Sequence, residues 1–160
     1  MRTEKEIIEA IDNYSDTVRR ICFVHLKNHA DTEDISQNVF LKYATSDIEF
    51  FDEEHKKAWI IRVSVNACKD LLRNAFRTHT VSLDELVDQP AVQNNENKEV
   101  LEAVLSLPAK YKDVVYLFFY EGYSAVEIAD ILNKNVNTIY TRLSRAKVLL
   151  KDILGGEEDE

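Results

Sequence analysis

The chain has 160 residues, of which 45% are hydrophobic and 31% charged, and this balance excludes a disordered chain and allows one or two cores. Because no run approaches the roughly 20 apolar residues of a membrane span and Gly and Pro are scarce, we expect an all-α protein of the cytoplasm without membrane insertion. The net charge of -9 opposes indiscriminate binding of the whole chain to nucleic acid, so any basic surface must be local.

Three helices are predicted in the first half of the chain. Apolar residues at helical spacing predict the first helix over 3–27. The second is expected to begin near Asp31, whose carboxylate can cap backbone amides, and to continue to Tyr43. After an aperiodic stretch, a third helix is predicted over 55–77. Its expected buried stripe consists of Ile60, Val63, Ala67 and Leu71.

The polar, acidic stretch 80–97 contains Pro90 and shows no sustained apolar period, which predicts a flexible linker between two small helical domains. The domains are expected at 1–79 and 98–155, followed by an acidic tail at 156–160. Helices of the second domain are predicted over 98–106, 109–120, 124–132 and 137–154. The buried stripe expected for the last helix consists of Val136, Ile139, Leu143, Ala146, Leu150 and Ile153.

The last two predicted helices have the spacing of a helix-turn-helix. Ser124 and Glu127 form a capping box, Asn133 stands where the turn needs a left-handed residue, and Asn135 can cap the second helix. From 131 to 151 there are five basic residues and no acidic one, although an ordinary helical hairpin with a solvated basic face remains the alternative. The predicted DNA-contacting residues here are Lys134, Asn137, Thr138, Tyr140, Thr141, Arg142 and Arg145.

A second basic locus lies on the predicted helix at 55–77. Four cations and one amide recur there at spacings of four, three, four and four residues, so they share a face opposite the apolar stripe: Arg62, Asn66, Lys69, Arg73 and Arg77. Trp59 lies toward the edge of that face, where an indole can stack on an unpaired base; the alternative is a core tryptophan beside a solvated stripe. The residues predicted to contact DNA here are Lys56, Lys57, Trp59, Arg62, Asn66, Lys69 and Arg73.

The cysteines and histidines give little indication of chemistry. Cys22 and Cys68 form no CxxC pair and are predicted to be buried thiols. His25 and His29 lie four residues apart, a spacing able to bind zinc, but no third ligand is evident, so we expect them at the surface or a helix end. No nucleophile and base can be singled out, so neither a metal, a cofactor nor enzymatic activity is predicted.

Three ordered blocks together resemble the extracytoplasmic-function sigma factors, which are minimal two-domain initiation factors of bacterial RNA polymerase. The blocks are DTEDISQNVFLKY at 31–43, AWIIRVSVN at 58–66 with DLLR at 70–73, and the stretch 107–146 from LP through EGYS to TIYTRLSRA. Three positions depart from the family pattern. They are Asn38 in place of Glu, Asn133 in place of Gly, and Lys134 in place of an apolar residue.

The resemblance implies partners and roles for these blocks. The helix at 31–43 would dock on core RNA polymerase, the helix at 55–77 would read and open the −10 promoter element with the loop at 47–54, and the helix-turn-helix would read the −35 element. The residues implied in polymerase binding are Asp34, Gln37, Asn38, Phe40 and Leu41. An anti-sigma factor is a further implied partner.

Other functions stay open from the residues alone. A conventional helix-turn-helix regulator would bind an operator without polymerase, usually as a dimer on a symmetric site. A protein that sequesters another factor would need no basic surface. For a sigma factor of net charge -9, we expect weak binding to free duplex and DNA recognition that depends on polymerase.

Overall fold

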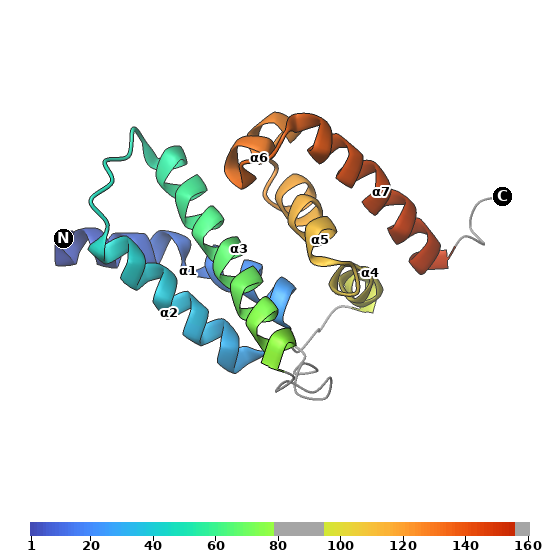
Figure 1. Ribbon diagram of the computed structural model, residues 1–160, viewed down its shortest axis with the longest axis horizontal. Coiled ribbons are helices and arrows are strands. Elements are labelled where there is room, and N and C mark those ends of the chain that lie inside the picture. Colours follow the sequence, from blue (N-terminus) through green and yellow to red (C-terminus); the bar gives the residue numbers. More distant parts are fainter. Residues whose placement is uncertain (79–94, 156–160) are drawn as a thin grey trace. The chain divides into compact units, whose positions relative to one another are not determined.

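The computed structural model describes residues 1–78 and 95–155, with side chains for 1–74 and 99–155. Its contacts divide the chain into two compact units, Met1–Gln89 (unit 1) and Pro90–Glu160 (unit 2). The described residues form helices and loops with no strand, which confirms the all-α class (Figure 1). None of the helices in these residues is both long and apolar enough to cross a membrane. The predicted tail and all of the predicted linker except 95–97, which begin a helix, lie outside the described residues.

The described residues of unit 1 form three helices around one core. Its helices are α1 (Glu4–Leu26), α2 (His29–Thr45) and α3 (Glu53–Thr78). Each helix packs against the other two, with α2 and α3 beside each other and α1 crossing them (Figure 1). Core side chains include Tyr14, Val18, Val39, Tyr43 and Ile60. Cys22 and Cys68 are buried and free, as predicted.

The start of α2 differs from the prediction by a few residues. The helix begins at His29, and its N-cap is Asn28, whose side-chain oxygen accepts a hydrogen bond of 2.9 Å from the backbone amide of Asp31. The expected cap at Asp31 is therefore wrong. Asp31 instead lies in the first turn, where its carboxylate interacts favourably with the positive end of the helix dipole.

The buried face of α3 is wider than the predicted stripe. Ile60, Ile61, Val65 and Cys68 are fully buried. The other three predicted stripe residues, Val63, Ala67 and Leu71, are only partly buried against the same core. The physical reason is that α3 packs on both α1 and α2, so two partners cover a broader arc than one apolar row indicates.

Unit 2 is built around its last helix. Its elements are α4 (Asn95–Leu105), α5 (Ala109–Val115), the π-helical turn η2 (Tyr116–Tyr120), α6 (Ala125–Leu132) and α7 (Val136–Gly155). The helix α7 packs against α4, α5 and α6 and runs beside α5 (Figure 1). The helix predicted over 109–120 changes at Tyr116 from α-helical to π-helical hydrogen bonding, and the amide of Glu121 bonds the carbonyl of Tyr116 at 3.1 Å.

Only the middle of the predicted stripe of α7 is fully buried. Ile139, Leu143 and Ala146 belong to the core of unit 2. Val136 and Leu150 are half-buried. Ile153 is 50% exposed, so its predicted burial is wrong: the last turns of α7 find little cover among the described residues of the unit.

Candidate functional site

The turn between α6 and α7 has the predicted helix-turn-helix chemistry. The Ser124 hydroxyl accepts from the amide of Glu127 at 3.1 Å, and the Glu127 carboxylate accepts from the amide of Ser124 at 2.8 Å. Asn133 adopts the left-handed conformation with φ 57. The Asn135 side chain accepts from the amide of Asn137 at 2.7 Å. These bonds fix the start of α6, the turn and the start of α7.

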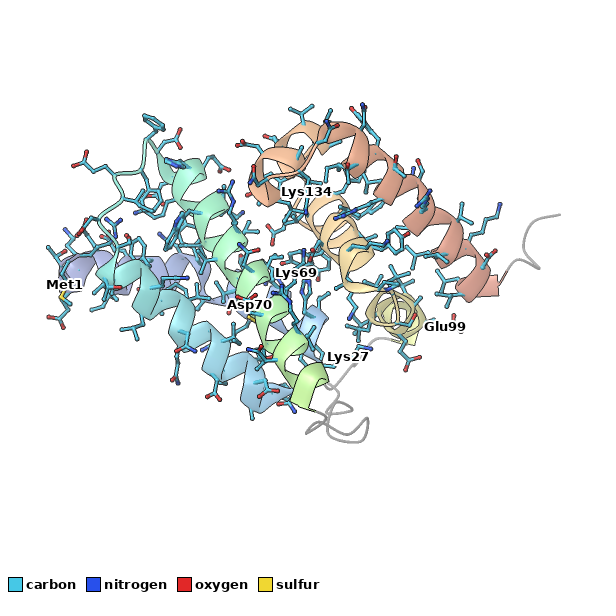
Figure 2. The ribbon with its side chains drawn as sticks, viewed as in Figure 1. Met1, Lys27, Lys69, Asp70, Glu99 and Lys134 are labelled. Atoms are coloured by element: carbon cyan, nitrogen blue, oxygen red, sulfur yellow. The ribbon has the colours of Figure 1, made fainter. Side chains whose placement is uncertain are left out.

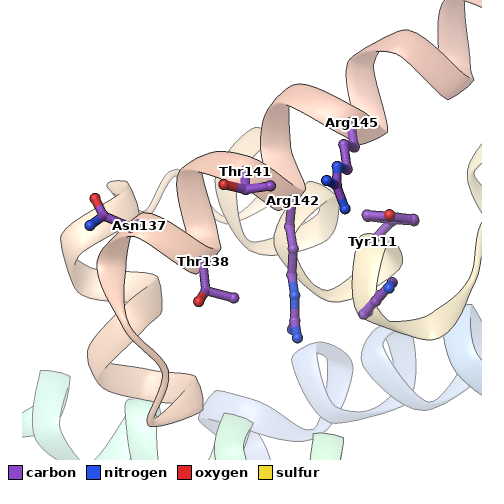
Figure 3. Close-up of a pocket in the computed structure, with 7 residues that line it drawn as sticks. Tyr111, Asn137, Thr138, Thr141, Arg142 and Arg145 are labelled. Atoms are coloured by element: carbon purple, nitrogen blue, oxygen red, sulfur yellow. The ribbon is translucent and has the colours of Figure 1, made fainter.

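Five of the seven predicted residues of the helix-turn-helix lie around one hollow on α7. The hollow has a volume of about 360 Å³ and is lined from α7 by Asn137, Thr138, Thr141, Arg142 and Arg145 (Figure 3). The other two lie outside it and are exposed. Tyr140 is 54% exposed on α7, and Lys134 lies in the turn before that helix (Figure 2). The structure thus places all seven where solvent reaches them.

Two further residues of the hollow come from α5 and were not predicted. They are Lys110 and Tyr111, and Lys110 Nζ lies 5.2 Å from the centroid of the Tyr111 ring. Their position in the sequence gives no signal, because only the packing of α5 on α7 brings them to this face. With hydroxyl, amide and cationic side chains together, the hollow can bond phosphate oxygens and the edges of bases.

The predicted basic face of α3 is present and is partly paired. Arg62 and Lys69 are half-buried, whereas Asn66 and Arg73 are exposed. Arg73 forms an ion pair of 3.4 Å with Asp70, which follows Lys69 on the same helix (Figure 2). Because both partners of this pair are exposed, the ion pair is weak and a phosphate can displace it.

The first turn of α3 is tied to α1. The Tyr14 hydroxyl donates to the Glu53 carboxylate at 2.5 Å, and this hydrogen bond lowers the pKa of Glu53. Lys56 lies 3.4 Å from Glu53, and its contacts with Tyr43 and Glu53 outweigh burial and raise the pKa of its ammonium. Lys56 therefore keeps its charge but is held toward the core, while Lys57 is half-buried.

Trp59 is more enclosed than a residue at the edge of an open basic face. It is half-buried, and its ring lies 6.3 Å from Tyr43 and 5.7 Å from Phe50, measured between ring centroids. The indole is therefore a partly buried residue packed against the core of unit 1. Its predicted contact with an unpaired base stays a prediction.

The loop between α2 and α3 is held by a residue that the sequence did not single out. The guanidinium of Arg2 donates to the carbonyl of Tyr43 at 3.1 Å and to the hydroxyl of Ser46 at 3.0 Å, and it lies over the Tyr43 ring. Beyond this clamp, Phe51 is 93% exposed and stacks on His55. The signal was absent from the sequence because Arg2 and the loop are far apart in it.

The predicted polymerase-binding helix α2 has one exposed face. Asp34, Gln37, Asn38 and Leu41 are exposed. Asn38 and Leu41 also line a hollow of about 270 Å³ with Lys42 and Thr45 of α2 and Val63 and Ala67 of α3. Phe40 does not belong to this surface: it is 7% exposed and packs in the core of unit 1, so its predicted direct contact requires correction.

The two histidines lie at helix ends, as predicted: His25 is in the last turn of α1 and His29 is the first residue of α2. His25 is buried, and its Nδ1 lies 2.9 Å from the carbonyl oxygen of Ile21. His29 is exposed, and its ring packs on Phe23. Within the described parts of the chain, no group of three or more potential metal-ligating side chains is found.

Comparisons with known proteins cover both units. The family described as Sigma-70 region 2 matches residues 10–78, and the family described as Sigma-70, region 4 matches residues 97–150. Two similar proteins come from Bacillus subtilis (strain 168). RNA polymerase sigma factor SigV is 28% identical over 98% of this chain and 95% of its own. ECF RNA polymerase sigma factor SigW is 27% identical over 89% of this chain and 86% of its own.

A solved structure gives the same fold. The sigma factor RpoE from Bartonella quintana, in complex with the anti-sigma factor NepR, superposes with a TM-score of 0.78 and 22% identity. The match covers 94% of this chain and 97% of that one. At this identity the likeness supports the arrangement of the helices and nothing finer.

Proposed function

The chain belongs to the extracytoplasmic-function sigma factors of bacterial RNA polymerase, and from this membership we propose a role for each of its two units. The protein directs promoter-specific transcription initiation. In our proposal, unit 1 binds core polymerase and opens the −10 element, and unit 2 recognises the −35 element. The observation that carries this proposal is the ordered match of the two sigma-70 regions, one within each compact unit.

The exposed face of α2 is the proposed polymerase contact. Asn38 and Leu41 supply a polar and an apolar group to the same shallow hollow, and Asp34 and Gln37 extend this face by one turn. An exposed leucine of this kind has no role in the core of its own unit. Burial against a partner helix would therefore gain free energy without unfolding unit 1.

The helix α3 is the proposed reader of the −10 element. Its basic face can follow the phosphates, and the aromatic side chains near its start can stack on an unpaired base. Extrusion of a base costs a few kcal/mol, and stacking on an aromatic ring returns about 1–3 kcal/mol. Capture of an open strand is therefore energetically feasible once polymerase holds the DNA in place.

The helix α7 is the proposed reader of the −35 element. The helix-turn-helix geometry presents its polar face to a major groove. Either arginine of the hollow, Arg142 or Arg145, can make a bidentate contact with guanine, which discriminates against other bases by about 1–3 kcal/mol. Lys134, in the turn before α7, can add a contact to the DNA backbone that does not depend on sequence.

The family membership also indicates the setting in which the chain acts. The RpoE protein that shares this fold is bound to an anti-sigma factor, and we propose that a protein of that class restrains this chain as well. Because polymerase and promoter DNA are in the cytoplasm, the chain acts there. Sigma factors are initiation factors without catalytic activity of their own, and we propose the same for this protein.

The test is reconstitution of transcription with purified core polymerase. Addition of the full chain is expected to produce transcripts that start at defined promoters of a genomic DNA library. Arg73→Ala and Arg142→Ala should each lower initiation at least about tenfold, which corresponds to the loss of about 1.4 kcal/mol of DNA contact. Both variants should retain wild-type affinity for core polymerase in a pull-down assay, since neither residue lies on α2.

Three results would contradict the proposal. If the chain fails to bind core polymerase, it cannot act as a sigma factor. If Arg73→Ala and Arg142→Ala transcribe like the wild type, the two DNA surfaces are misplaced. If the free chain binds its target duplex as tightly as the holoenzyme does at equal salt, the conventional regulator is the better description.

A further inference from the structure

The hollow between α5 and α7 reaches beyond the recognition helix. Its lining includes Lys110 and Tyr111 from α5, in addition to five residues of the proposed −35 surface. Both helices belong to unit 2 and pack directly on each other, so this geometry is internal to one unit. Figure 3 shows Arg142 and Arg145 extending from α7 on the side of the helix where Tyr111 lies.

The charge of the hollow selects an anionic ligand. Three of its side chains, Lys110, Arg142 and Arg145, are cations, and none of its residues is an acid. Among the described residues, no carboxylate forms an ion pair with any of these three. Like charges around one hollow repel each other, and a bound phosphate group removes that repulsion and accepts charge-assisted hydrogen bonds.

Lys110 is held in place by its neighbour. Its ammonium lies 5.2 Å from the centroid of the Tyr111 ring, a cation–π distance. Tyr111 is only 8% exposed, so the packing of the unit fixes its ring. The cation is thus positioned at the hollow before any ligand binds, which reduces the entropy that binding would otherwise cost.

We propose that this hollow is a phosphate-binding site and that its ligand is a phosphodiester group of the promoter DNA backbone, held by Lys110 together with whichever of Arg142 and Arg145 does not contact guanine. The inference rests on the proposed −35 function of α7. Continuity favours DNA over a free polyphosphate of the same chemistry, because the hollow is the direct extension of the polar face of α7. A backbone contact from α5 fixes the register of α7 on the duplex without reading a base.

The test measures how promoter binding by the holoenzyme depends on salt. Holoenzyme containing the full chain is bound to a fragment that it selects from random-sequence DNA, from about 50 to 200 mM salt. Loss of one phosphate contact in Lys110→Ala should reduce the slope of log K against log salt by about 0.9. The loss of affinity should be equal on fragments that differ in the −35 sequence, because a phosphate contact carries no base information.

Two variants serve as controls for the charge and for its geometry. Lys147→Ala removes an exposed cation of α7 that lies outside the hollow and should leave the salt slope unchanged. Lys110→Arg keeps the charge and should keep the wild-type slope. Far-UV circular dichroism of each variant verifies that the fold is intact.

Defined outcomes overturn the inference. The inference is wrong if holoenzyme with Lys110→Ala keeps the wild-type slope of log K against log salt. It is also wrong if the variant loses affinity for only one −35 sequence. Inorganic pyrophosphate is titrated against the free chain; if Lys110→Ala abolishes its binding but leaves the DNA slope unchanged, the site takes a free polyphosphate instead. Initiation by the wild-type holoenzyme is measured in parallel: its absence refutes the proposed function, whereas normal initiation with an unchanged slope refutes only the phosphate site.

Discussion

Two neighbouring residues of α2, Phe40 and Leu41, have opposite surroundings. Phe40 is 7% exposed in the core of unit 1, and Leu41 is 63% exposed beside the shallow hollow that it shares with Asn38. One step along a helix turns the side chain by about 100°, which is enough to move it from the core to solvent. The two positions therefore separate the stability of unit 1 from the proposed polymerase contact.

Truncation at these positions should have different effects. Phe40→Ala is expected to lower the free energy of unfolding by about 3–5 kcal/mol, because it leaves a cavity in the core. Leu41→Ala should change it by less than about 0.5 kcal/mol and weaken binding to core polymerase about tenfold. Urea unfolding and titration of labelled core polymerase measure the two quantities. Normal polymerase affinity in Leu41→Ala would argue against the proposed contact.

The Tyr14–Glu53 pair links α1 to α3 through one short hydrogen bond. That bond lowers the pKa of the Glu53 carboxyl, and the nearby ammonium of Lys56 lowers it further. The burial of the phenol, together with the same bond, raises the pKa of Tyr14. A carboxyl whose pKa is lower in the folded state stabilises the fold above its unfolded value of about 4.3, and this stabilisation is lost as pH falls through the folded value.

Tyr14→Phe should therefore have an effect that depends on pH. We expect the variant to lose about 1 kcal/mol of stability at neutral pH, since the bond is to a charged but largely exposed carboxylate. The difference from the wild type should shrink as pH falls below the unfolded value of about 4.3 and through the lowered pKa of folded Glu53. Trp59 is the one tryptophan of the chain and reports on unit 1 by fluorescence during urea unfolding. A difference that stays constant from neutral to acid pH would contradict the assigned charge.

The turn of the helix-turn-helix depends on one unusual backbone conformation. Asn133 has φ 57, and the next amide, that of Lys134, bonds the carbonyl of Ala129 at 2.9 Å. The left-handed conformation costs an ordinary residue about 1–2 kcal/mol, whereas Asn tolerates it better and Gly adopts it freely. Asn133 thus adopts, at the end of α6, the left-handed conformation that glycine usually supplies there.

Substitution at Asn133 should follow these conformational costs. Asn133→Ala is expected to lower the stability of unit 2 by about 1 kcal/mol, and Asn133→Gly to change it by less than about 0.5 kcal/mol. Far-UV circular dichroism follows both units during urea unfolding, and Trp59 fluorescence serves as an internal control that should not shift. Equal losses in the two variants would show that the left-handed conformation is not the cause.

The distribution of charge over the whole chain opposes DNA binding by the free protein. The net charge is -9, yet the segment 131–151 contains only basic charged residues. Repulsion between the acidic remainder and DNA weakens binding, and each basic surface alone can neutralise few phosphates. A polymerase that holds both units makes the second DNA contact effectively intramolecular.

Free chain and holoenzyme should therefore differ strongly on one promoter fragment. At about 150 mM salt we expect the holoenzyme to bind at least about a hundredfold more tightly than the chain alone, the lower range of gains from linked contacts. Fluorescence anisotropy of the labelled fragment, with core polymerase alone as the control, gives the three affinities. If the holoenzyme binds the fragment less than tenfold more tightly than the free chain does, promoter recognition does not depend on polymerase.

Local chemistry explains why much of the protein could be predicted from its amino-acid sequence alone. Helical periodicity predicted the helices. The capping box at Ser124 and the left-handed residue Asn133 predicted the helix-turn-helix, because each of these signals lies within a few consecutive residues. Local signals were less reliable at helix ends and at the edges of buried faces. Asn28 caps α2 in place of Asp31, and Ile153 is exposed.

Features that join distant parts of the chain could not be foreseen in this way. Phe40 is buried because α2 packs against two other helices at once, and Trp59 is half-enclosed because Phe50 and Tyr43 close over it. Lys110 joins the surface of α7 only through the packing of α5 on that helix. Such contacts depend on which helix faces pack against each other. Helical periodicity shows that a face is apolar, but it does not show which other helix that face contacts.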